Sequence, residues 1–383
     1  MHLPNALLLG RLWRPDVGAS GGPCIATVRN GQVWDITSRE APTVRDACEL
    51  DDPAGYVAAA KGEAIGRLDE LLAAPVGDLS ATHLLAPCDL QSVKACGVTF
   101  AGSMVERVIE ERAAGDPSAA QAIRERIGVL IGDSLKDITP GSDEAMAVKK
   151  ALMAEGLWSQ YLEVGIGPDA EVFSKAQVLS SVGHGAKVGL HPSSKWNNPE
   201  PEVVLAVSSK GTILGATLGN DVNLRDIEGR SALLLSKAKD NNASCAIGPF
   251  IRLFADGFTL DDVRRQTLTL HVEGPDGFVL HGHSDMAQIS RDPVDLVAQT
   301  IGAHHQYPDG IMLFLGTLFA PTQDRDPDGA PGDGFTHKLG DVVTISSPDL
   351  GALTNTVDLS TNCPPWTFGI RALMGNLASR NLL

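Results

Sequence analysis

The sequence has no long apolar run, no excess of basic residues and no closely spaced cysteines. Because no apolar run approaches the roughly 20 residues of a membrane span, we expect a soluble protein. The 47 acidic residues outnumber the 31 basic ones, and the formal charge of −16 disfavours nucleic acids and anionic membranes as partners. This charge does not exclude an anionic substrate, because a bound cation inverts the local field.

Other absences narrow the chemistry further. The six cysteines are scattered, without a Cys-x-x-Cys pair or a close Cys/His cluster, so we expect free thiols rather than disulfides or a zinc site. The sequence contains no phosphate loop and no dinucleotide fingerprint. Residues 1–11 lack the basic leader and long apolar core of a secretory signal, which predicts a cytoplasmic protein.

The length of the chain favours two domains, since one domain typically has about 100–200 residues and this chain has 383. We expect residues 1–85 to form a small β-rich domain. Its strand-like runs are Ile25–Val28 and Gln32–Ile36, and a helix is predicted from near Glu63 to Ala74.

Residues 86–383 are predicted to form the catalytic domain. The apolar run Val93–Phe100 predicts a buried strand. A helical region over about residues 103–161 is predicted from residues at helical spacing in Ser103–Ala114, Ser118–Leu135 and Asp143–Tyr161. From about Val182 onward, strand-like runs, Gly and Pro dominate. We therefore expect a mainly β (α+β), mostly antiparallel fold with a helical excursion.

One predicted hairpin carries three acidic residues. The apolar runs Glu202–Val207 and Thr212–Leu218 flank the turn formers Ser208–Gly211. With the turn centred on Ser209 and Lys210, Glu200 pairs with Gly219 and Glu202 pairs with Thr217. Asp221 then lies diagonally beside Glu200, and all three carboxylates share one face.

Three carboxylates that converge in this way predict a divalent-metal site. Each charge disfavours ionisation of the others unless a cation is present. Oxygen ligands with no cysteine nearby select Mg²⁺, with Mn²⁺ or Ca²⁺ as substitutes, rather than zinc. The alternative is the beginning of a strand with solvated acids.

Five short motifs follow one another along the chain, and together, in this order, they resemble the signature of the fumarylacetoacetate hydrolase family. The resemblance covers roughly residues 85–360. It implies a β-sandwich or β-roll catalytic domain that follows a small barrel-like N-terminal domain. The motifs are Gly97-Val98-Thr99-Phe100, Pro199-Glu200-Pro201-Glu202, Asp221-Val222-Asn223-Leu224-Arg225-Asp226, Lys239 eight residues before Ile247-Gly248-Pro249-Phe250, and Leu315-Gly316-Thr317.

The resemblance also implies roles for individual residues. It implies Mg²⁺ held by Glu200, Glu202 and Asp221, with Lys239 near the developing negative charge of the substrate. The matched motifs further imply that four residues bind the substrate, namely Lys239, Asn223, Arg225 and Thr317.

One position departs from the family's hydrolases. Those enzymes activate water with a histidine and a glutamate three residues later, and here these positions are Ser103 and Glu106. A serine hydroxyl without a partner is no general base near neutral pH. The pair also fits a capping box at the start of a helix. Catalysis and capping both remain open for these two residues.

Further segments resemble the branch of the family that dehydrates 2-keto-3-deoxy sugar acids. This implies a hydro-lyase that converts a 2-keto-3-deoxypentonate to 2,5-dioxopentanoate in pentose catabolism. The segments are Ser103 with Glu106, Asn197–Glu202, Glu228–Ser231 with Lys237–Asn242, and His305–Gly310.

A β-elimination needs no attacking water, so the loss of the histidine favours a lyase over a carbon–carbon hydrolase. Mg²⁺ chelated by the 2-oxo acid would acidify C3, and Lys239 would help to stabilise the enolate. Glu106 is the predicted proton shuttle, with Ser103 or a water completing the relay.

Two rival functions remain. The first is a hydrolase or decarboxylase of acylpyruvate-like diketo acids that activates water through His184 or His191. The second is a non-catalytic protein that binds a sugar acid or a metal ion. The predicted partners are a small 2-oxo acid and further copies of the chain in a homodimer or homotetramer, the kind of assembly that the resemblance implies, with no nucleic acid and no membrane.

Overall fold

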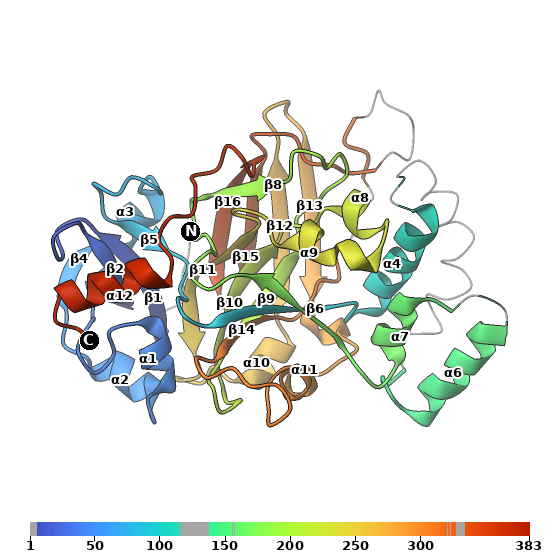
Figure 1. Cartoon of the computed structure of the whole chain (residues 1–383), viewed down its shortest axis with the longest axis horizontal. Coiled ribbons are helices and arrows are strands. Elements are labelled where there is room, and N and C mark those ends of the chain that lie inside the picture. Colours follow the sequence, from blue (N-terminus) through green and yellow to red (C-terminus); the bar gives the residue numbers. More distant parts are fainter. Residues whose placement is uncertain are drawn as a thin grey trace.

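The computed structural model describes residues 6–114, 116, 138–154, 156, 158–319, 321, 323–326 and 334–383. Within these residues the strands form two sheets, which lie against each other in the middle of the molecule (Figure 1). Helices gather at the edges. The mainly β fold with helical excursions is therefore confirmed.

The larger sheet has eleven strands. Its order is β4-β3-β2-β1-β11-β10-β9-β14-β6-β7, and β5 also pairs with β1. Its neighbours are antiparallel except for β14 and β6, which run parallel. The strands are β1 (Leu8–Arg14), β2 (Gly22–Arg29), β3 (Gln32–Asp35), β4 (Glu63–Arg67), β5 (His83–Leu85), β6 (Ser92–Gly97), β7 (Glu171–Ala176), β9 (Pro201–Val207), β10 (Ile213–Asp221), β11 (Cys245–Leu253) and β14 (Ile311–Phe314).

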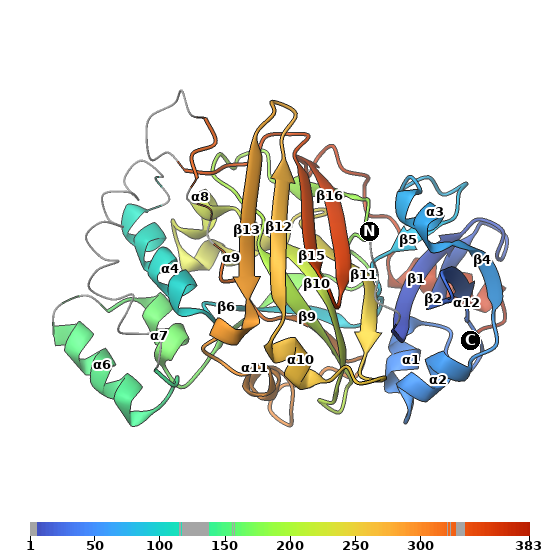
Figure 2. The same ribbon diagram turned by 180° about the vertical axis from the view of Figure 1, so that it is seen from behind.

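The second sheet has five strands in the order β13-β12-β15-β16-β8 and covers β9 and β10 (Figure 2). Apolar side chains from both sheets fill the space between them, among them Val203, Leu205 and Leu218 from the larger sheet and Leu270 and Ile345 from the smaller. This core confirms the predicted sandwich. The strands are β8 (Lys187–Leu190), β12 (Thr267–Glu273), β13 (Val279–Asp285), β15 (Val342–Ser347) and β16 (Gly351–Leu359).

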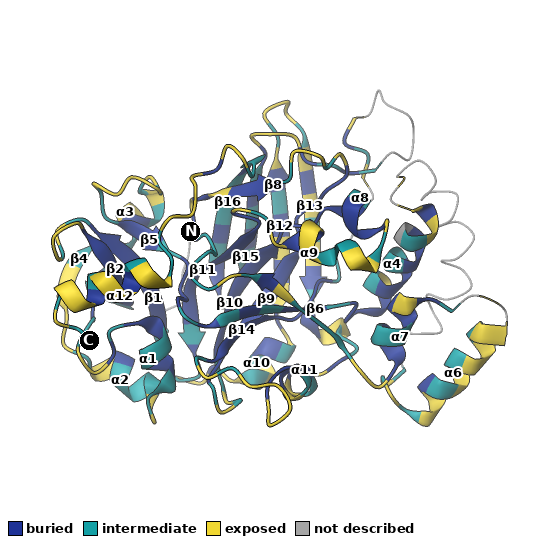
Figure 3. Ribbon diagram, viewed as in Figure 1, coloured by how far each residue is buried: buried dark blue, intermediate teal, exposed yellow. Residues whose placement is uncertain are grey.

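Helices connect the strands and line the edges of the sheets. Figure 3 shows that the strands at the centre are mostly buried, while α6 and α12 carry much exposed surface. No helix among the described residues combines the length and apolar character that a membrane span requires. The helices are α1 (Val44–Glu49), α2 (Pro53–Ala59), α3 (Leu68–Ala73), α4 (Ala101–Ala113), α6 (Asp143–Ala154), α7 (Gln160–Ile166), α8 (Arg225–Glu228), α9 (Leu235–Lys239), α10 (Leu260–Arg264), α11 (Pro293–Thr300) and α12 (Ile370–Ser379), with 3-10 turns η2 (Ala232–Leu234) and η3 (Met286–Gln288).

The N-terminal strands were predicted more accurately than the N-terminal helix. Strand β2 contains the predicted run Ile25–Val28, and β3 covers the predicted run Gln32–Ile36 except for Ile36. The helix predicted from near Glu63 is wrong over its first half, because Glu63–Arg67 pairs with β3 as β4 and the helix α3 begins only at Leu68. Pairing with a neighbouring strand has overridden local helix propensity there.

The C-terminal helix lies against the N-terminal part of the chain. Helix α12 contacts the N-terminal strands, where Asn376 Nδ2 donates to Gly21 O at 2.6 Å and Arg380 Nη1 donates to Pro23 O at 2.7 Å. Strand β1 also pairs with β11 of the larger sheet. The boundary between residues 85 and 86 remains a prediction.

The helical excursion follows β6, which ends at Gly97 because Val98 has a left-handed φ of 56°. Helix α4 is close to the predicted Ser103–Ala114. The pattern over Asp143–Tyr161 gives two helices rather than one, since α6 ends at Ala154 and Ser159 caps α7 by accepting from Leu162 N. The predicted helix Ser118–Leu135 lies outside the described residues.

The acidic hairpin is formed by β9 and β10, but its register differs from the prediction by two residues. Glu202 faces Gly219, and Glu200 lies opposite Asp221, whose N–H donates to Glu200 O at 3.1 Å. The turn itself is centred on Ser209 and Lys210 as expected, with Gly211 N donating to Ser208 O.

Two extra residues account for the shift. Gly211 has a left-handed φ of 79°, so Ser208 pairs with Thr212. Leu214 then bulges between Ile213 and Gly215. Each adds one residue to the second strand. Because side chains alternate faces with a period of two, a shift of two leaves all three carboxylates on the predicted face.

Replacement of Gly211 by Val is expected to lower the free energy of unfolding by about 1–2 kcal/mol, the cost of a left-handed conformation with a Cβ. Crowding does not contribute, because the nearest atom to a Cβ there is Ile301 Cγ2 at 3.8 Å. Gly211→Asn should cost less, because Asn tolerates this conformation. Chemical denaturation of both variants is the measurement, and equal stability of G211V and wild type would contradict the turn geometry.

Candidate metal and substrate site

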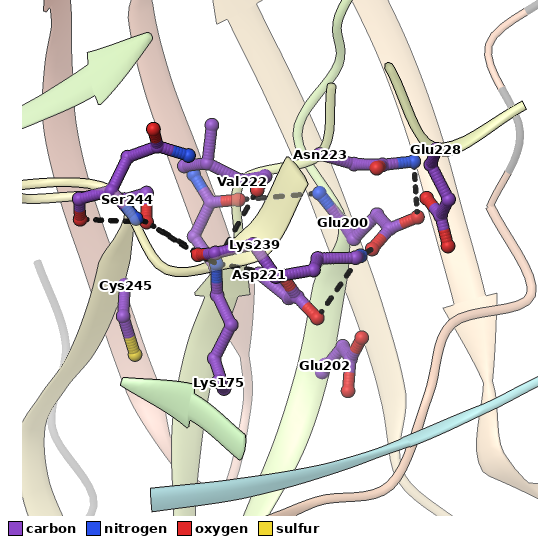
Figure 4. Close-up of polar contacts among 12 residues, drawn as sticks. Lys175, Glu200, Glu202, Asp221, Val222, Asn223, Glu228, Lys239, Ser244 and Cys245 are labelled. Atoms are coloured by element: carbon purple, nitrogen blue, oxygen red, sulfur yellow. Dashed lines mark hydrogen bonds and ion pairs between the residues drawn. The ribbon is translucent and has the colours of Figure 1, made fainter. Parts of the chain in front are cut away.

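Three buried carboxylates converge at the end of the β9–β10 hairpin. Glu200 directly precedes β9, Glu202 lies on β9 and Asp221 ends β10. One oxygen from each carboxylate lies within 4.8 Å of the others (Figure 4). The hairpin therefore brings the predicted ligands together, and Glu200 and Asp221 are direct cross-strand neighbours rather than diagonal ones.

Two lysines from other segments neutralise part of this charge. Lys239, at the end of α9, places Nζ 2.7 Å from Glu200 Oε2 and 3.2 Å from Asp221 Oδ2. Lys175 on β7 has no exposed surface, and its Nζ lies 3.0 Å from Asp221 Oδ1 and donates to Lys239 O at 2.6 Å. Lys175 therefore contacts both a carboxylate of the cluster and the main chain that carries Lys239.

Arg107 is a third basic residue in contact with the cluster. From α4 its Nη2 lies 2.7 Å from Glu200 Oε1, and its Nη1 lies 3.0 Å from Glu228 Oε2. Asn223 Nδ2 also donates to Glu200 Oε1 at 3.1 Å. On β9, Glu202 Oε2 accepts from Gly316 N at 2.7 Å.

The pKa values of the cluster are shifted because its carboxylates and basic groups are buried close together. Burial, then the charges of Asp221 and Glu200, raise the pKa of Glu202 well above its usual value. Burial also acts to raise the pKa of Asp221, but Lys175 and Lys239 outweigh it and lower that pKa. Burial acts to lower the pKa of Lys239, yet Asp221 and Glu200 raise it overall. The cluster therefore does not hold all its carboxylates ionised without a further cation.

The donor set fits a hard divalent cation. Besides the three carboxylates, Asn198 Oδ1 and Asn223 Oδ1 are buried in the same cavity, and no donor among the described residues hydrogen-bonds to either oxygen. Buried oxygens without partners call for a ligand. Mg²⁺ takes about six oxygen ligands and keeps several waters, so carboxylates with open positions beside them suit it. Glu200, Glu202 and Asp221 could hold such an ion.

A fourth carboxylate, Glu171, was not identified from the sequence. It begins β7 opposite Gly97, where any Cβ would collide with its carboxylate. Burial, followed by the charge of Glu228, raises the pKa of Glu171 to about 7. This residue therefore exchanges a proton near neutral pH inside the cavity that holds the metal-site carboxylates.

Ser103 and Glu106 both line this cavity but have different partners. Helix α4 begins at Ala101, so Ser103 lies inside the helix, and the predicted capping box of Ser103 with Glu106 is wrong. Ser103 Oγ instead bonds to the main chain of Phe100, donating to Phe100 O at 2.9 Å and accepting from Phe100 N at 3.3 Å. Glu106 Oε2 lies 3.6 Å from Arg225 Nη2.

The other predicted substrate-binding residues also line the cavity. Arg225 stacks its guanidinium on Trp196, 4.2 Å from the ring centre. Thr317 Oγ1 accepts from Phe319 N at 3.1 Å. His184 and His191, the bases considered for a hydrolase, do not line it. His184 Nδ1 accepts from Thr354 N at 3.2 Å, and His191 bonds to Ser193.

This fold and site define a member of a known family. The family model described as the C-terminal domain of fumarylacetoacetate (FAA) hydrolase matches residues 167–358. The chain therefore belongs to the fumarylacetoacetate hydrolase family. The matched segment contains the three carboxylates and Lys239.

Two curated relatives that match the chain are named dehydratases. The chain is 29% identical over 197 residues to the "Probable 2-keto-3-deoxyxylonate dehydratase" of Haloferax volcanii, across 51% of this chain and 63% of that protein. It is 30% identical over 190 residues to the "2-dehydro-3-deoxy-D-arabinonate dehydratase" of Saccharolobus solfataricus, across 49% of this chain and 58% of that protein. The matches thus span less than two thirds of either relative's length.

A solved structure shares the fold over nearly the whole chain. A 2-keto-3-deoxy-D-arabinonate dehydratase, complexed with magnesium and 2,5-dioxopentanoate, superposes with a TM-score of 0.62 at 20% identity. The superposition covers 91% of this chain and 99% of that one. At this level of identity the likeness shows the fold.

Replacement of Asp221 by Asn is expected to weaken Mg²⁺ binding by at least about tenfold. Loss of a residue that only supports a metal ligand already weakens metal affinity by about that factor, and Asp221 is a predicted ligand itself. Titration calorimetry with Mg²⁺, or electron paramagnetic resonance with Mn²⁺, measures the change. Asp226→Asn is the matched control, because Asp226 bonds to Ser194 and Lys195 rather than lining the cavity. Equal affinity in D221N and D226N would contradict the metal assignment.

Replacement of Glu171 by Gln is expected to stabilise the metal-free protein in a pH-dependent way. The folded pKa of about 7 exceeds the unfolded value near 4.3, so stability is lost as the pH rises from about 4 to 7. Well above pH 7 the wild type should be less stable than E171Q by up to about 4 kcal/mol, and the difference should vanish below about pH 3.5.

Thermal unfolding of both proteins in EDTA at pH 5 and pH 8 measures this effect. The exposed Glu40→Gln is the control and should leave the difference between the two pH values unchanged. A constant effect of E171Q across the pH range would contradict the raised pKa.

Proposed function

We propose that this protein is a Mg²⁺-dependent dehydratase of a 2-keto-3-deoxy sugar acid, which converts a 2-keto-3-deoxypentonate to 2,5-dioxopentanoate in sugar-acid catabolism. The observation that carries the proposal is one cavity that combines a carboxylate metal site, Lys239 and a carboxyl group that titrates near neutral pH. The names of both curated relatives support it.

The metal site suits a 2-oxo acid. When bound, Mg²⁺ supplies Lewis-acid polarisation of the 2-oxo group. Lys239 is held at Glu200 and Asp221 by ion pairs, so its ammonium group lies beside the carboxylates that would hold the metal. From there it would stabilise the negative charge that develops on the C2 oxygen and C3 of a metal-bound 2-oxo acid. Asn198 and Asn223 each have an amide oxygen without a donor among the described residues, and these oxygens could accept from substrate hydroxyl groups.

The elimination requires a base that accepts the C3 proton and an acid that protonates the departing C4 hydroxyl, which leaves as water. Tautomerisation of the resulting unsaturated acid, with protons lost from C5 and its hydroxyl group and gained at C3 and C4, then gives the aldehyde of 2,5-dioxopentanoate. Glu171 suits both roles in the elimination, because a pKa near 7 makes it a base in one state and an acid in the other. Glu106, the shuttle predicted from the sequence, is the alternative, and its ion-pair contact with Arg225 favours a binding role instead. Ser103 donates its proton to Phe100 O, which weakens it as a relay.

The same arrangement disfavours a hydrolase. Ser103 stands where the family's hydrolases have a histidine, and His184 and His191 lie outside the cavity. Elimination needs no activated water. We further propose that Mn²⁺ or Ca²⁺ can replace Mg²⁺, and that the protein is a cytoplasmic homodimer or homotetramer.

Incubation of the protein and Mg²⁺ with 2-keto-3-deoxypentonates, 2-keto-3-deoxyhexonates and acylpyruvates tests the function. We expect a pentonate to give a new aldehyde, detected by hydrazone formation and mass spectrometry, and activity to disappear in EDTA. Cleavage of an acylpyruvate into two acids would instead identify a hydrolase. Tight binding without turnover would identify a binding protein.

Two variants separate the candidate proton shuttles. Glu171→Gln should lower kcat by about 100-fold or more while substrate binding changes little, since general acid–base catalysis is worth about 10²–10⁴. In the wild type kcat/KM should rise with pH to a plateau above about 7, as Glu171 becomes a base. If Glu106→Gln rather than E171Q abolishes turnover, the assignment of Glu171 is wrong.

A further inference from the structure

A second cavity lies away from the carboxylate cluster and is lined in part by the N-terminal strands β1 and β5 and by the segment that leads into α12. Its volume is about 610 Å³, within the range of about 300–1,000 Å³ typical of sites for small molecules. It shares no lining residue with the metal and substrate cavity.

The charge of this cavity is the reverse of that of the chain. The sequence carries a net charge of −16, yet no Asp or Glu is found among the described residues that line the cavity. The basic residues in its wall are Arg11 and Lys187, together with His83. A wall with this composition disfavours cations and favours an anion.

Arg11 is the centre of this charge. It is only 6% exposed, and its one hydrogen bond to the described residues runs from Nη1 to Cys88 O at 2.8 Å. No carboxylate among the described residues lies within ion-pair distance, whereas Lys187 is paired with Asp358 at 2.7 Å. The charge of Asp89 acts on Arg11 only from beyond ion-pair distance. A buried guanidinium with no direct ion-pair partner is costly, because its desolvation is only partly offset. An anionic ligand would supply a direct partner.

The remaining wall is apolar and aromatic. Trp13 and Phe368 meet edge to face with ring centres 5.7 Å apart, and Trp366 also lines the cavity. Both indole N–H groups already donate to main-chain oxygens, Trp13 to Leu79 and Trp366 to Phe368. The rings therefore offer apolar surface rather than hydrogen bonds, which suits the flat body of an aromatic ligand.

We propose that this cavity binds a small aromatic acid, with its anionic group paired to Arg11 and its ring held among Trp13, Trp366 and Phe368. The wall also includes Asn242 and Ala243, which closely follow Lys239 in the sequence. The ligand therefore contacts the loop that follows Lys239, a residue of the metal and substrate cavity at the end of α9. The proposal stands independently of the reaction proposed above.

Two fluorescent probes test the requirement for charge. 1-Anilinonaphthalene-8-sulfonate and N-phenyl-1-naphthylamine share one aromatic body, and only the first carries a sulfonate. We expect the native full-length protein to bind one sulfonate probe per chain, at least about tenfold more tightly than the neutral probe, as for a hydrogen bond to a charged group. Indole-3-acetate should displace it, and indole-3-acetamide should not. Equal binding of both probes would overturn the proposal.

Variants of the wall localise the binding. Trp366→Ala should weaken binding of the sulfonate probe by about tenfold or more, and Trp366 is 46% exposed, so the variant should fold. Trp158→Ala, away from the cavity, is the matched control and should bind as the wild type does. Arg11→Met should remove the preference for the anionic probe, provided that its thermal unfolding remains cooperative.

Two results would contradict the assignment. One is unchanged probe binding in W366A. The other is a wild type that binds neither probe while W366A alters the oligomeric state in light scattering, which would make this wall a contact between copies of the chain.

Discussion

Three carboxylates on one face of the β9–β10 hairpin repel one another where water has little access, and the surrounding chain is arranged to offset that repulsion. Lys175 approaches from β7, Lys239 from α9 and Arg107 from α4, each in ion-pair contact with Glu200 or Asp221. Segments that are far apart in sequence are therefore held together by charge at one point. The helical excursion, through Arg107 of α4, therefore contacts the sandwich at the acidic end of this hairpin.

The sequence was sufficient to predict what depends on local pattern. The mainly antiparallel β fold, the hairpin with its turn at Ser209 and Lys210, and the convergence of Glu200, Glu202 and Asp221 all follow from apolar runs and turn formers. The sandwich itself was implied by the resemblance to the family. The pairing of individual residues did not follow, because neither the left-handed Gly211 nor the bulge at Leu214 has an unambiguous sequence signal.

Features that depend on distant pairing were out of reach. Glu171 enters the cavity only because β7 pairs with β6 and Gly97 leaves room for its carboxylate. A fully buried lysine such as Lys175 is equally unexpected from an isolated strand, since its counter-charge comes from Asp221 on another element. The capping box predicted for Ser103 failed for a smaller reason, since α4 begins at Ala101, three residues earlier than a helix capped by Ser103 would begin.

The two extra residues in the hairpin have a consequence for how this chain can vary during evolution. Gly211 and Leu214 each displace the second strand by one position, and only their combined effect returns Asp221 to the side that holds Glu200 and Glu202. Loss of either one alone would turn Asp221 towards the opposite side of the sheet. Insertions and deletions between Val207 and Gly215 should therefore survive selection mainly in even numbers, so that homologues with turns of different length keep the same parity.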